Sequence, residues 1–304
     1  MSLANIDTRK TILLTGATGY LGSNLLQALL ARSDYRVIVL KRSFSNTFRI
    51  SNCLDYVTAY NLDEVELESV FRDNQVDLIL HCATDYGRKN VNPLQVVEAN
   101  LILPLKLMEI GIKYGVKGFI NTDTILDKRI NHYSLSKKQF KDWLISYRNE
   151  LICINVVSEH FYGPGDDKTK FVSFVIDSYL RRVAKIELTL GEQKRDFIYI
   201  DDMVDAFIKI IDYAFTLSNG FYEFQTGSEQ VTTVKDLVQM IGTILDNKIT
   251  YPDFGALPYR ENEVMECVAD TTELKKLGWQ PQNSLLAGLQ KTIKQELNNL
   301  TEQL

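Results

Sequence analysis

The sequence has few of the residues that build metal sites or disulfide frameworks. Its 304 residues include only three histidines and four cysteines, and no two cysteines form a CxxC pair. This sparse set disfavours a zinc site and a disulfide-linked fold, so we expect no metal and a reducing compartment for the thiols.

Long hydrophobic runs and an excess of positive charge are also missing. No stretch approaches about 18 consecutive apolar residues, and the opening MSLANIDTRK lacks an apolar signal segment. The net charge is −5, whereas a nucleic-acid-binding surface needs an excess of Lys and Arg. We therefore expect a cytoplasmic protein that binds neither membranes nor nucleic acid.

What the sequence does contain is a regular alternation of apolar strands and helices. Near-continuous apolar strands separated by helices are typical of a parallel sheet covered on both faces, so we predict a doubly wound α/β fold. The predicted strands lie at residues 11–15, 36–40, 76–82, 117–122 and 151–157, and the predicted long helices at about 93–115 and 132–149.

The character of the sequence changes after about residue 162. A loop rich in Gly, Pro and Asp, FYGPGDDKTK, is followed by shorter and less regular segments. We predict two domains: a nucleotide-binding domain over residues 1–164 and a smaller α/β substrate-binding lobe over 165–304. Segments within about 195–227 are expected to return to the first domain.

A glycine-rich turn, TGATGYLG, joins the first strand to a helix. Gly16 permits a tight turn, Gly19 lets backbone amides approach a pyrophosphate, and Gly22 allows close packing of helix and strand. Because the triplet lies between a strand and a helix, we predict a Rossmann dinucleotide site. A purely structural turn is the alternative.

The end of the second strand indicates which dinucleotide is bound. An acidic residue there would hold the ribose hydroxyl of NAD, but this sequence has Lys41 and Arg42. Cations suit a 2′-phosphate, so NADP is favoured. The alternative is two solvated charges after a strand.

A tyrosine and a lysine lie four residues apart near the start of the helix predicted at 132–149. Tyr133 and Lys137 share one helix face with Phe140 and Leu144, so this face packs inward. A neighbouring ammonium would bring the phenol pKa down from about 10, which would suit Tyr133 to proton transfer at a substrate carbonyl. A surface helix with two unrelated polar residues is the alternative.

Several short motifs resemble a known family. TGATGYLG, YSLSK, YGPG and RDFIYIDD occur in the order typical of the extended short-chain dehydrogenase/reductases, also called the NAD-dependent epimerase/dehydratase family, and the resemblance covers most of the chain. It implies catalytic Tyr133 and Lys137 with a Ser or Thr hydroxyl at the end of the strand predicted at 117–122. We prefer Thr122, since the following Asp matches the Thr-Asp pair of dehydratases, and keep Thr124 as the alternative.

The resemblance also implies the ligand contacts. It places at the cofactor Gly16, Thr18, Gly19, Tyr20, Leu21, Lys41, Arg42, Asn61, Leu62, Cys82, Ala83, Thr84, Asn100, Tyr133 and Lys137. It places at a nucleotide-sugar substrate Thr124, His160, Lys170, Phe171, Arg195 and Arg260. Two arginines would let an acidic protein hold a diphosphate bidentately. The alternative is ion pairing of Arg195 with Asp196 and of Arg260 with Glu261.

The reaction type follows from departures from the family pattern. Dehydratases of the family carry Thr-Asp-Glu at the strand end, whereas the third position here is Thr124, which cannot serve as the base. Only ten residues separate Thr122 from Tyr133, so the site wall is short and brings Lys128 and Arg129 near. A single hydride transfer remains.

The segment INTDTILDKRINHYSLSKKQF most resembles the CDP-abequose and CDP-paratose synthase group, which reduces the 4-keto group of a CDP-3,6-dideoxyhexose with NADPH in deoxysugar and O-antigen biosynthesis. We therefore predict an NADPH-dependent 4-ketoreductase. The alternatives are an NAD-dependent nucleotide-sugar 4-epimerase and a non-catalytic NADP-binding sensor or scaffold. The resemblance also implies a homodimer formed through the two long helices.

Overall fold

The computed structural model describes residues 8–88 and 92–301, which belong to two compact units. Unit 1 comprises the chain up to Val157 together with Phe207–Phe224, and unit 2 comprises Ser158–Ala206 together with the chain from Gln225 onward. The division lies earlier than the predicted residue 164. The segment that returns to unit 1 lies within the predicted range of about 195–227.

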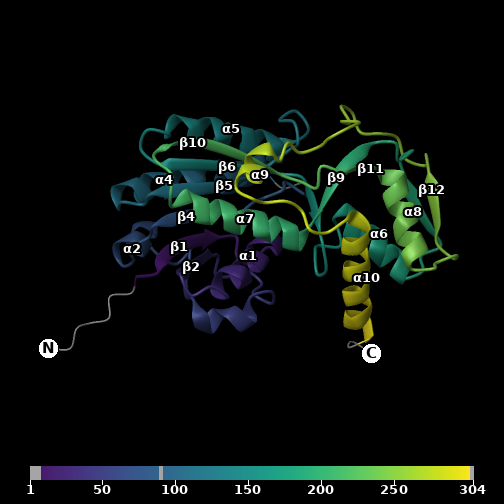
Figure 1. Cartoon of the computed structure of the whole chain (residues 1–304), viewed down its shortest axis with the longest axis horizontal. Coiled ribbons are helices and arrows are strands. Elements are labelled where there is room, and N and C mark those ends of the chain that lie inside the picture. The colour runs from purple at the N-terminus through teal and green to yellow at the C-terminus, as the bar shows by residue number, and fades with distance from the viewer. Residues whose placement is uncertain (1–7, 89–91, 302–304) are drawn as a thin grey trace. The chain divides into compact units, whose positions relative to one another are not determined.

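The core of unit 1 is a seven-stranded sheet with the order β10-β6-β5-β4-β1-β2-β3 (Figure 1). The pairings of β5 with β4, β4 with β1, β1 with β2 and β2 with β3 are all parallel. This topology confirms the predicted doubly wound fold. The strands are β1 (Lys10–Thr15), β2 (Tyr35–Lys41), β3 (Thr58–Asn61), β4 (Leu78–His81), β5 (Gly118–Thr124), β6 (Ile152–Ser158) and β10 (Gly220–Thr226).

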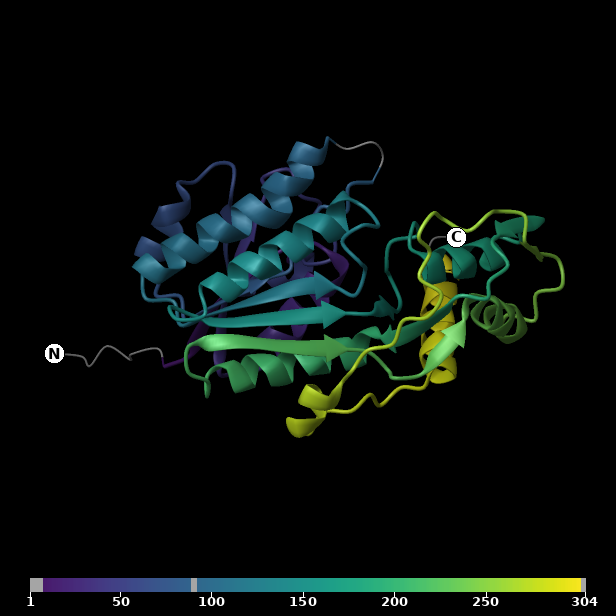
Figure 2. The same cartoon turned by 90° about the horizontal axis from the view of Figure 1, so that it is seen from above.

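Helices cover both faces of this sheet. Figure 2 shows α4 and α5 on one side of the strands and α7 on the other. The helices are α1 (Tyr20–Leu30), α2 (Leu67–Arg72), α3 (Pro93–Val97), α4 (Leu103–Lys113), α5 (His132–Ser146) and α7 (Ile200–Ala214), with the 3-10 helix η1 (Ser51–Tyr56) and the π-helix η2 (Glu98–Ile102). The single helix predicted at 93–115 is therefore three consecutive segments, α3, η2 and α4.

Apolar strand residues and one helix stripe build the core of unit 1. β5 is buried along its whole length, and its Phe119 lies against Phe140 of α5, with ring centroids 5.6 Å apart. Phe140 and Leu144 are fully buried, so the stripe that also contains Lys137 faces the sheet as predicted. The burial of this stripe carries Lys137 to the end of β5.

Among the described residues, unit 2 contains two small sheets, four helices and the first part of α7, which continues into unit 1. The three-stranded sheet has the order β11-β9-β7, and the two-stranded sheet pairs β12 with β8 in parallel. The strands are β7 (His160–Tyr162), β8 (Lys185–Leu188), β9 (Lys194–Tyr199), β11 (Val231–Thr233) and β12 (Tyr251–Phe254). The helices are α6 (Phe171–Leu180), α8 (Val234–Ile244), α9 (Thr272–Lys276) and α10 (Leu285–Thr301).

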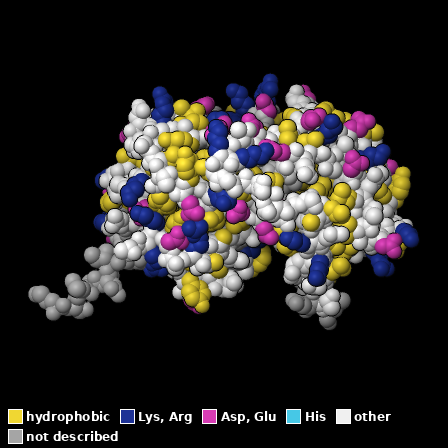
Figure 3. All heavy atoms as spheres, in the orientation of Figure 1, with side chains coloured by type: hydrophobic (Ala, Val, Ile, Leu, Met, Phe, Trp, Pro, Cys, Tyr) yellow, Lys and Arg dark blue, Asp and Glu magenta, His cyan; other side chains and the backbone are white. Residues whose placement is uncertain are grey.

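The distribution of surface charge and the length of the apolar helices bear on binding to nucleic acid and to membranes. On the face shown in Figure 3, Lys and Arg side chains are interspersed with Asp and Glu. Across residues 8–88 and 92–301, no helix combines the length and the apolar character needed to cross a membrane.

Candidate active site

The glycine turn between β1 and α1 is built for close approach of the backbone. Gly16 has φ of +72°, and a Cβ there would lie 2.5 Å from Cys82 C and Ala83 N. A Cβ on Gly22 would collide with the Gly16 carbonyl oxygen. Gly16 and Gly22 are therefore required as glycine, because the end of β4 and the start of α1 both press against the turn.

This turn leaves the start of α1 suited to an anion. Gly19 is the N-cap residue and brings no side chain to the first helical turn, and its N–H bonds the Gly16 carbonyl at 2.9 Å. A helix N-terminus of this kind favours a phosphate through its amide groups and dipole. The start of α1 thus fits the phosphates of a dinucleotide, with Thr18, Tyr20 and Leu21 adjacent to Gly19.

The segment after β4 forms the next wall of this site. His81 is fully buried, and its Nδ1 lies 2.9 Å from Thr15 Oγ1, which also accepts a bond from Ala83 N. Burial, with Lys137 nearby, holds the pKa of His81 well below its usual range, so the imidazole is neutral. The chain at Cys82, Ala83 and Thr84 therefore passes directly alongside Gly16.

Asn100, which the sequence predicts as a cofactor contact, is hydrogen-bonded within unit 1. This buried residue lies in the π-helix η2, and its side chain exchanges hydrogen bonds with the backbone of Asp85 and donates to Ser136 Oγ at 3.0 Å. Its amide therefore connects the loop after β4 to the start of α5. Ser136 lies between Tyr133 and Lys137 on α5, so this bond attaches the π-helix to the turn of α5 that carries both residues. π-Helices occur frequently at functional sites.

The helix carrying the tyrosine and lysine begins where the sequence predicted. Asn131 and Ser134 form a capping box that starts α5 at His132, so Tyr133 lies in the first turn and Lys137 one turn later. Lys137 is only 1% exposed, and its ammonium donates to the Thr122 carbonyl oxygen at 2.9 Å. Burial lowers its pKa to about 8, and nearby Asp123 partly opposes that shift.

Tyr133 is half-buried and packed against a residue that sequence reasoning missed. The Tyr86 ring lies 5.0 Å from it, centroid to centroid. Burial, followed by the effect of Tyr86, raises the pKa of Tyr133, and a hydrogen bond with the Thr124 side chain partly opposes this. The expected lowering of the phenol pKa by Lys137 was wrong, because burial dominates and the Lys137 ammonium bonds a main-chain carbonyl instead.

The two candidate threonines point to different partners. The Thr122 hydroxyl donates to the His81 carbonyl oxygen at 3.1 Å, across the β5–β4 pairing. The Thr124 side chain is hydrogen-bonded to Tyr133. Of the two threonines, Thr124 is therefore the one whose side chain bonds the phenol, whereas the Thr122 hydroxyl is engaged by the end of β4.

The ends of β2 and β3 hold the residues predicted at the adenosine end of the cofactor. Lys41 donates to Asn61 Oδ1 at 2.5 Å, and the N–H of Leu62 bonds the Lys41 carbonyl. The Arg42 guanidinium lies 4.8 Å from the Phe44 ring. Sequence reasoning missed Arg49, whose guanidinium lies 6.0 Å from the ring of Tyr20 at the start of α1.

The short segment between β5 and α5 carries two predicted wall residues, Lys128 and Arg129. Arg129 is engaged by Asp127 at 2.7 Å, and its side chain is 79% exposed. This exposed pair of neighbouring residues is screened by solvent, so it contributes little to holding the segment.

Unit 2 contains the other predicted substrate residues. Arg195 on β9 is only 11% exposed and forms an ion pair with Glu263, not with the suggested Asp196. The carboxylate of Asp196 accepts bonds from Ser228 and from the N–H groups of Glu229 and Ala269. The contact with Glu263 brings Arg195 to the segment of Arg260, which is itself exposed.

The remaining predicted substrate residues lie around β7 and the start of α6. His160 Nδ1 is 3.1 Å from Glu159 Oε2, and its ring packs against Phe197. Lys170 is the N-cap residue of α6, with its ammonium 4.3 Å from the Phe161 ring, and Phe171 is the first residue of that helix. These contacts connect β7, β9 and α6 within unit 2.

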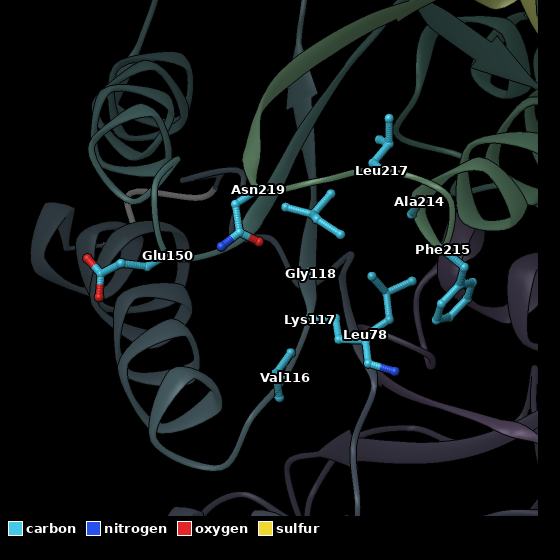
Figure 4. A pocket seen from close by; sticks show the side chains of 10 residues that line it. Leu78, Val116, Lys117, Gly118, Glu150, Ala214, Phe215, Leu217 and Asn219 are labelled. Atoms are coloured by element: carbon cyan, nitrogen blue, oxygen red, sulfur yellow. The ribbon is translucent and has the colours of Figure 1, made fainter.

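A pocket of about 340 Å³ lies at the other end of the strands, beside the amino ends of β4, β5 and β6 (Figure 4). Lys117, Glu150 and Asn219 are the polar side chains among its lining residues. Ligands of doubly wound folds bind outside the carboxyl ends of the strands, where Thr124 and His81 lie. We therefore assign the candidate active site to the carboxyl ends of the strands.

With this geometry, comparison with known proteins defines the class. The family described as "NAD dependent epimerase/dehydratase family" matches residues 12–222, which is more than half of the chain. The chain therefore belongs to the NAD-dependent epimerase/dehydratase family.

Within that family, the chain is 32% identical over 297 residues to the CDP-abequose synthase of Salmonella typhimurium, covering 94% of this chain and 98% of that protein. It is 30% identical over 271 residues to the CDP-abequose synthase of Yersinia pseudotuberculosis, covering 84% and 90%. These relatives place the chain among nucleotide-sugar-modifying enzymes of the family.

Solved structures show the same fold. The UDP-glucose 4-epimerase of Thermotoga maritima, solved with UDP-glucose, superposes with a TM-score of 0.82 at 26% identity and covers 95% of this chain and 99% of that one. The UDP-glucuronic acid 4-epimerase of Bacillus cereus, solved with UDP-glucuronic acid and NAD, gives a TM-score of 0.81 at 21% identity, covering 95% and 99%.

Proposed function

We propose that this protein is an NADPH-dependent reductase of the 4-keto group of a nucleotide-activated deoxysugar, with a CDP-4-keto-3,6-dideoxyhexose as its substrate. The observation that carries the proposal is the Tyr133 phenol, hydrogen-bonded to Thr124 one helical turn before the buried Lys137. The similarity to enzymes named CDP-abequose synthase supports the choice of substrate.

The protonation state of Tyr133 is compatible with reduction. Its raised pKa keeps the phenol protonated at neutral pH, so a proton is available for the substrate oxygen. When bound, the reduced cofactor supplies a hydride to the carbonyl carbon. Tyr133 then gives its proton to the carbonyl oxygen, so that C=O becomes CH–OH, and water reprotonates the phenolate.

Other residues of unit 1 complete this arrangement. The Thr124 hydroxyl donates a hydrogen bond to the same substrate oxygen, and the Lys137 ammonium would hold the ribose of the cofactor. Loss of water by the dehydratase route is not supported, because Asp123 already accepts bonds from Lys138, Asn155 and the N–H of Thr124. Thr124 also lacks the carboxylate needed to remove a carbon-bound proton.

The preference for NADP rests on the cations at the end of β2. Lys41 and Arg42 occupy the position at which an NAD enzyme has an acidic residue, and Arg49 approaches the start of α1 next to Tyr20. Arginine suits a phosphate because of its planar donor geometry. The NAD present in solved structures of this fold supports the opposite preference, so the cofactor needs a direct test.

The cofactor preference can be tested by replacing, one at a time, the arginines in and after β2. Arg42→Ala and Arg49→Ala should each raise the KM for NADPH by roughly tenfold and leave the KM for NADH nearly unchanged, since each removes one charged phosphate contact. Arg36→Ala is the matched control, because Arg36 lies near the amino end of β2 and bonds Asn74. Equal KM values for NADPH and NADH in the wild type would contradict NADP preference.

The reaction is tested by mixing purified protein, NADPH and CDP-4-keto-3,6-dideoxyglucose and following absorbance at the nicotinamide wavelength. The wild type should oxidise NADPH, and Tyr133→Phe should slow turnover by roughly 10²- to 10⁴-fold. Tyr114→Phe is the control, because the Tyr114 hydroxyl bonds Glu68 on α2. A Tyr133→Phe enzyme with the wild-type rate would contradict the mechanism.

An NAD-dependent nucleotide-sugar 4-epimerase is the second candidate, favoured by the structural similarity to UDP-glucose 4-epimerase. An epimerase returns its hydride to the substrate, so it retains NAD and consumes none. Stoichiometric NAD in the purified protein, with interconversion of C4 epimers and no net NADPH oxidation, would replace the reductase proposal.

We also propose that the protein is a cytoplasmic homodimer. All four cysteines are unpaired, which fits a reducing compartment. Large apolar side chains are exposed on α3 and α5, including Leu94 at 71% and Trp143 at 48%. Trp143→Glu should therefore convert a dimer to a monomer in light scattering, whereas Tyr251→Glu on β12 should not.

A further inference from the structure

We propose that Asp123 is a positioning residue, whose carboxylate, held by Lys138 and Asn155, fixes the end of β5 so that the Thr124 hydroxyl faces Tyr133. This inference rests on the proposed function, in which Thr124 and Tyr133 act on the substrate oxygen. It assigns a role to the one fully buried carboxylate side chain among the strand-end residues 122–124.

The carboxylate of Asp123 is saturated with donors. Asp123 Oδ1 accepts the N–H of Thr124 at 2.7 Å, and Oδ2 accepts Lys138 Nζ at 3.1 Å and Asn155 Nδ2 at 3.0 Å. A buried carboxylate is tolerated only when it is paired and hydrogen-bonded in this way. With three donors engaged, Asp123 has a fixed orientation and holds the backbone of Thr124.

Two consecutive lysines of α5 donate hydrogen bonds to the main chain of β5 on either side of Asp123. Lys137 donates to the Thr122 carbonyl at 2.9 Å, and Lys138 donates to the Thr124 carbonyl at 2.5 Å. The helix that carries Tyr133 is therefore attached to both threonines through their main chain. Asp123 supplies the negative charge that keeps the second ammonium in this half-buried position.

The same network extends across the sheet and strengthens the attachment. Asn155 on β6 accepts from Asn121 Nδ2 at 2.8 Å and donates to Glu223 Oε2 at 2.9 Å, and Glu223 on β10 pairs with Lys141 of α5 at 2.5 Å. β5, β6, β10 and α5 thus share one set of polar contacts. This network contacts α5 at two residues, Lys138 and Lys141, and would therefore rigidify the helix relative to β5.

The charge of Asp123 also acts on Lys137, so the positioning role has a signature that simple destabilisation lacks. Asp123 raises the pKa of Lys137, and Lys138 lowers it. The titratable groups that interact with Lys137 come from β4 and the residue after it, from β5 and from α5, and are His81, Cys82, Asp123 and Lys138. Removing Asp123 or Lys138 should therefore move the basic limb of the activity profile in opposite directions.

The test compares Asp123→Asn with Asp77→Asn. Asp77 is a matched control at the amino ends of the strands. It is buried, pairs with Lys117 at 3.2 Å and accepts a hydrogen bond from the main-chain N–H of Thr11. Asp123→Asn should lower kcat for NADPH oxidation by roughly 10- to 100-fold with KM little changed, since small misplacements of reacting groups cost on the order of 10² in rate. Asp77→Asn should lose thermal stability and keep kcat.

The pH profile provides the second measurement. Asp123→Asn should shift the basic limb of kcat to lower pH, and Lys138→Met should shift it to higher pH. A wild-type kcat in Asp123→Asn, or shifts of the same sign in both variants, would overturn the inference even if NADPH is oxidised.

Hydrogen exchange measured by mass spectrometry separates this inference from the proposed function, because it needs no turnover. Exchange across residues 118–126 should accelerate in Asp123→Asn and stay at the wild-type rate in Asp77→Asn. Absence of NADPH oxidation by the wild type would count against the proposed function alone. Unchanged exchange at 118–126 in Asp123→Asn would count against the positioning role alone.

Discussion

The buried ammonium of Lys137 donates to the main-chain carbonyl of Thr122, 2.9 Å away, and so joins α5 to the end of β5. This contact uses one of the three ammonium hydrogens and fixes the direction of the others. Burial of the ammonium, which disfavours its charged form, lowers the pKa of Lys137 to about 8. The first prediction follows from this shift.

Activity should fall as pH rises through about 8, because Lys137 loses its proton there instead of at its ordinary value near 10.5. An unfolded chain keeps that proton up to about 10.5, so the folded protein binds fewer protons between these values and the destabilisation by Lys137 is relieved as pH rises. The full effect is on the order of 3 kcal/mol. Urea unfolding at pH 7 and pH 10 should show this gain for the wild type relative to Lys137→Met, and equal pH dependence of the two would contradict it.

The two threonines of β5 should respond differently to loss of their hydroxyls. Thr124→Val should reduce kcat by roughly 10- to 100-fold, since a positioned donor to a developing oxyanion is worth up to about 10²–10³. Thr122→Val should leave kcat nearly unchanged and lower stability by about 1 kcal/mol, because it loses only the bond to the His81 carbonyl. Steady-state kinetics and urea unfolding of both variants measure this difference. The reverse pattern would restore Thr122 as the catalytic alcohol.

Two glycines with similar backbone conformations should differ in their tolerance of alanine. At Gly16, φ of +72° combines with a Cβ position 2.5 Å from Cys82 C and Ala83 N, whereas Gly115 has φ of +78° and an added Cβ meets no described atom within 4 Å. Gly115→Ala should cost only the strain of about 1–2 kcal/mol. Gly16→Ala should cost more and abolish NADPH binding in calorimetry, and equal losses in both variants would show that the contact with the end of β4 is unimportant.

Two neighbouring aspartates at the start of α7 should contribute unequally to unit 2. The buried Asp202 accepts the N–H groups of Gln282 and Asn283 at 2.9 and 3.0 Å, whereas Asp201 is exposed. Asp202→Ala should destabilise unit 2 by about 1–2 kcal/mol, because two partly buried main-chain N–H groups lose their acceptor. Trp279, whose indole donates to the Asp202 carbonyl, is a fluorescence reporter of this unfolding. Asp201→Ala is the control and should unfold at nearly the wild-type temperature.

The sequence by itself determined the fold class and the main elements of the nucleotide site. Apolar runs such as β1 and β5 and the inward stripe through Phe140 are local patterns that predict their own burial. The spacing of Gly16 and Gly22 predicted a turn that the end of β4 makes obligatory. Short elements such as β3 and α2 were missed, because four to six residues give too little periodicity to distinguish.

Only the tertiary structure decided which side chains meet at the end of β5. The pairing of β5 with β4 directs the Thr122 hydroxyl to a carbonyl, and the packing of α5 brings Tyr133 to Thr124. The direction of the Tyr133 pKa depends on burial and on Tyr86, which is distant in sequence. Sequence spacing predicts which residues share a face of a helix. The charge state of a side chain and the identity of its hydrogen-bond partner depend instead on solvent exclusion and on contacts with distant parts of the chain.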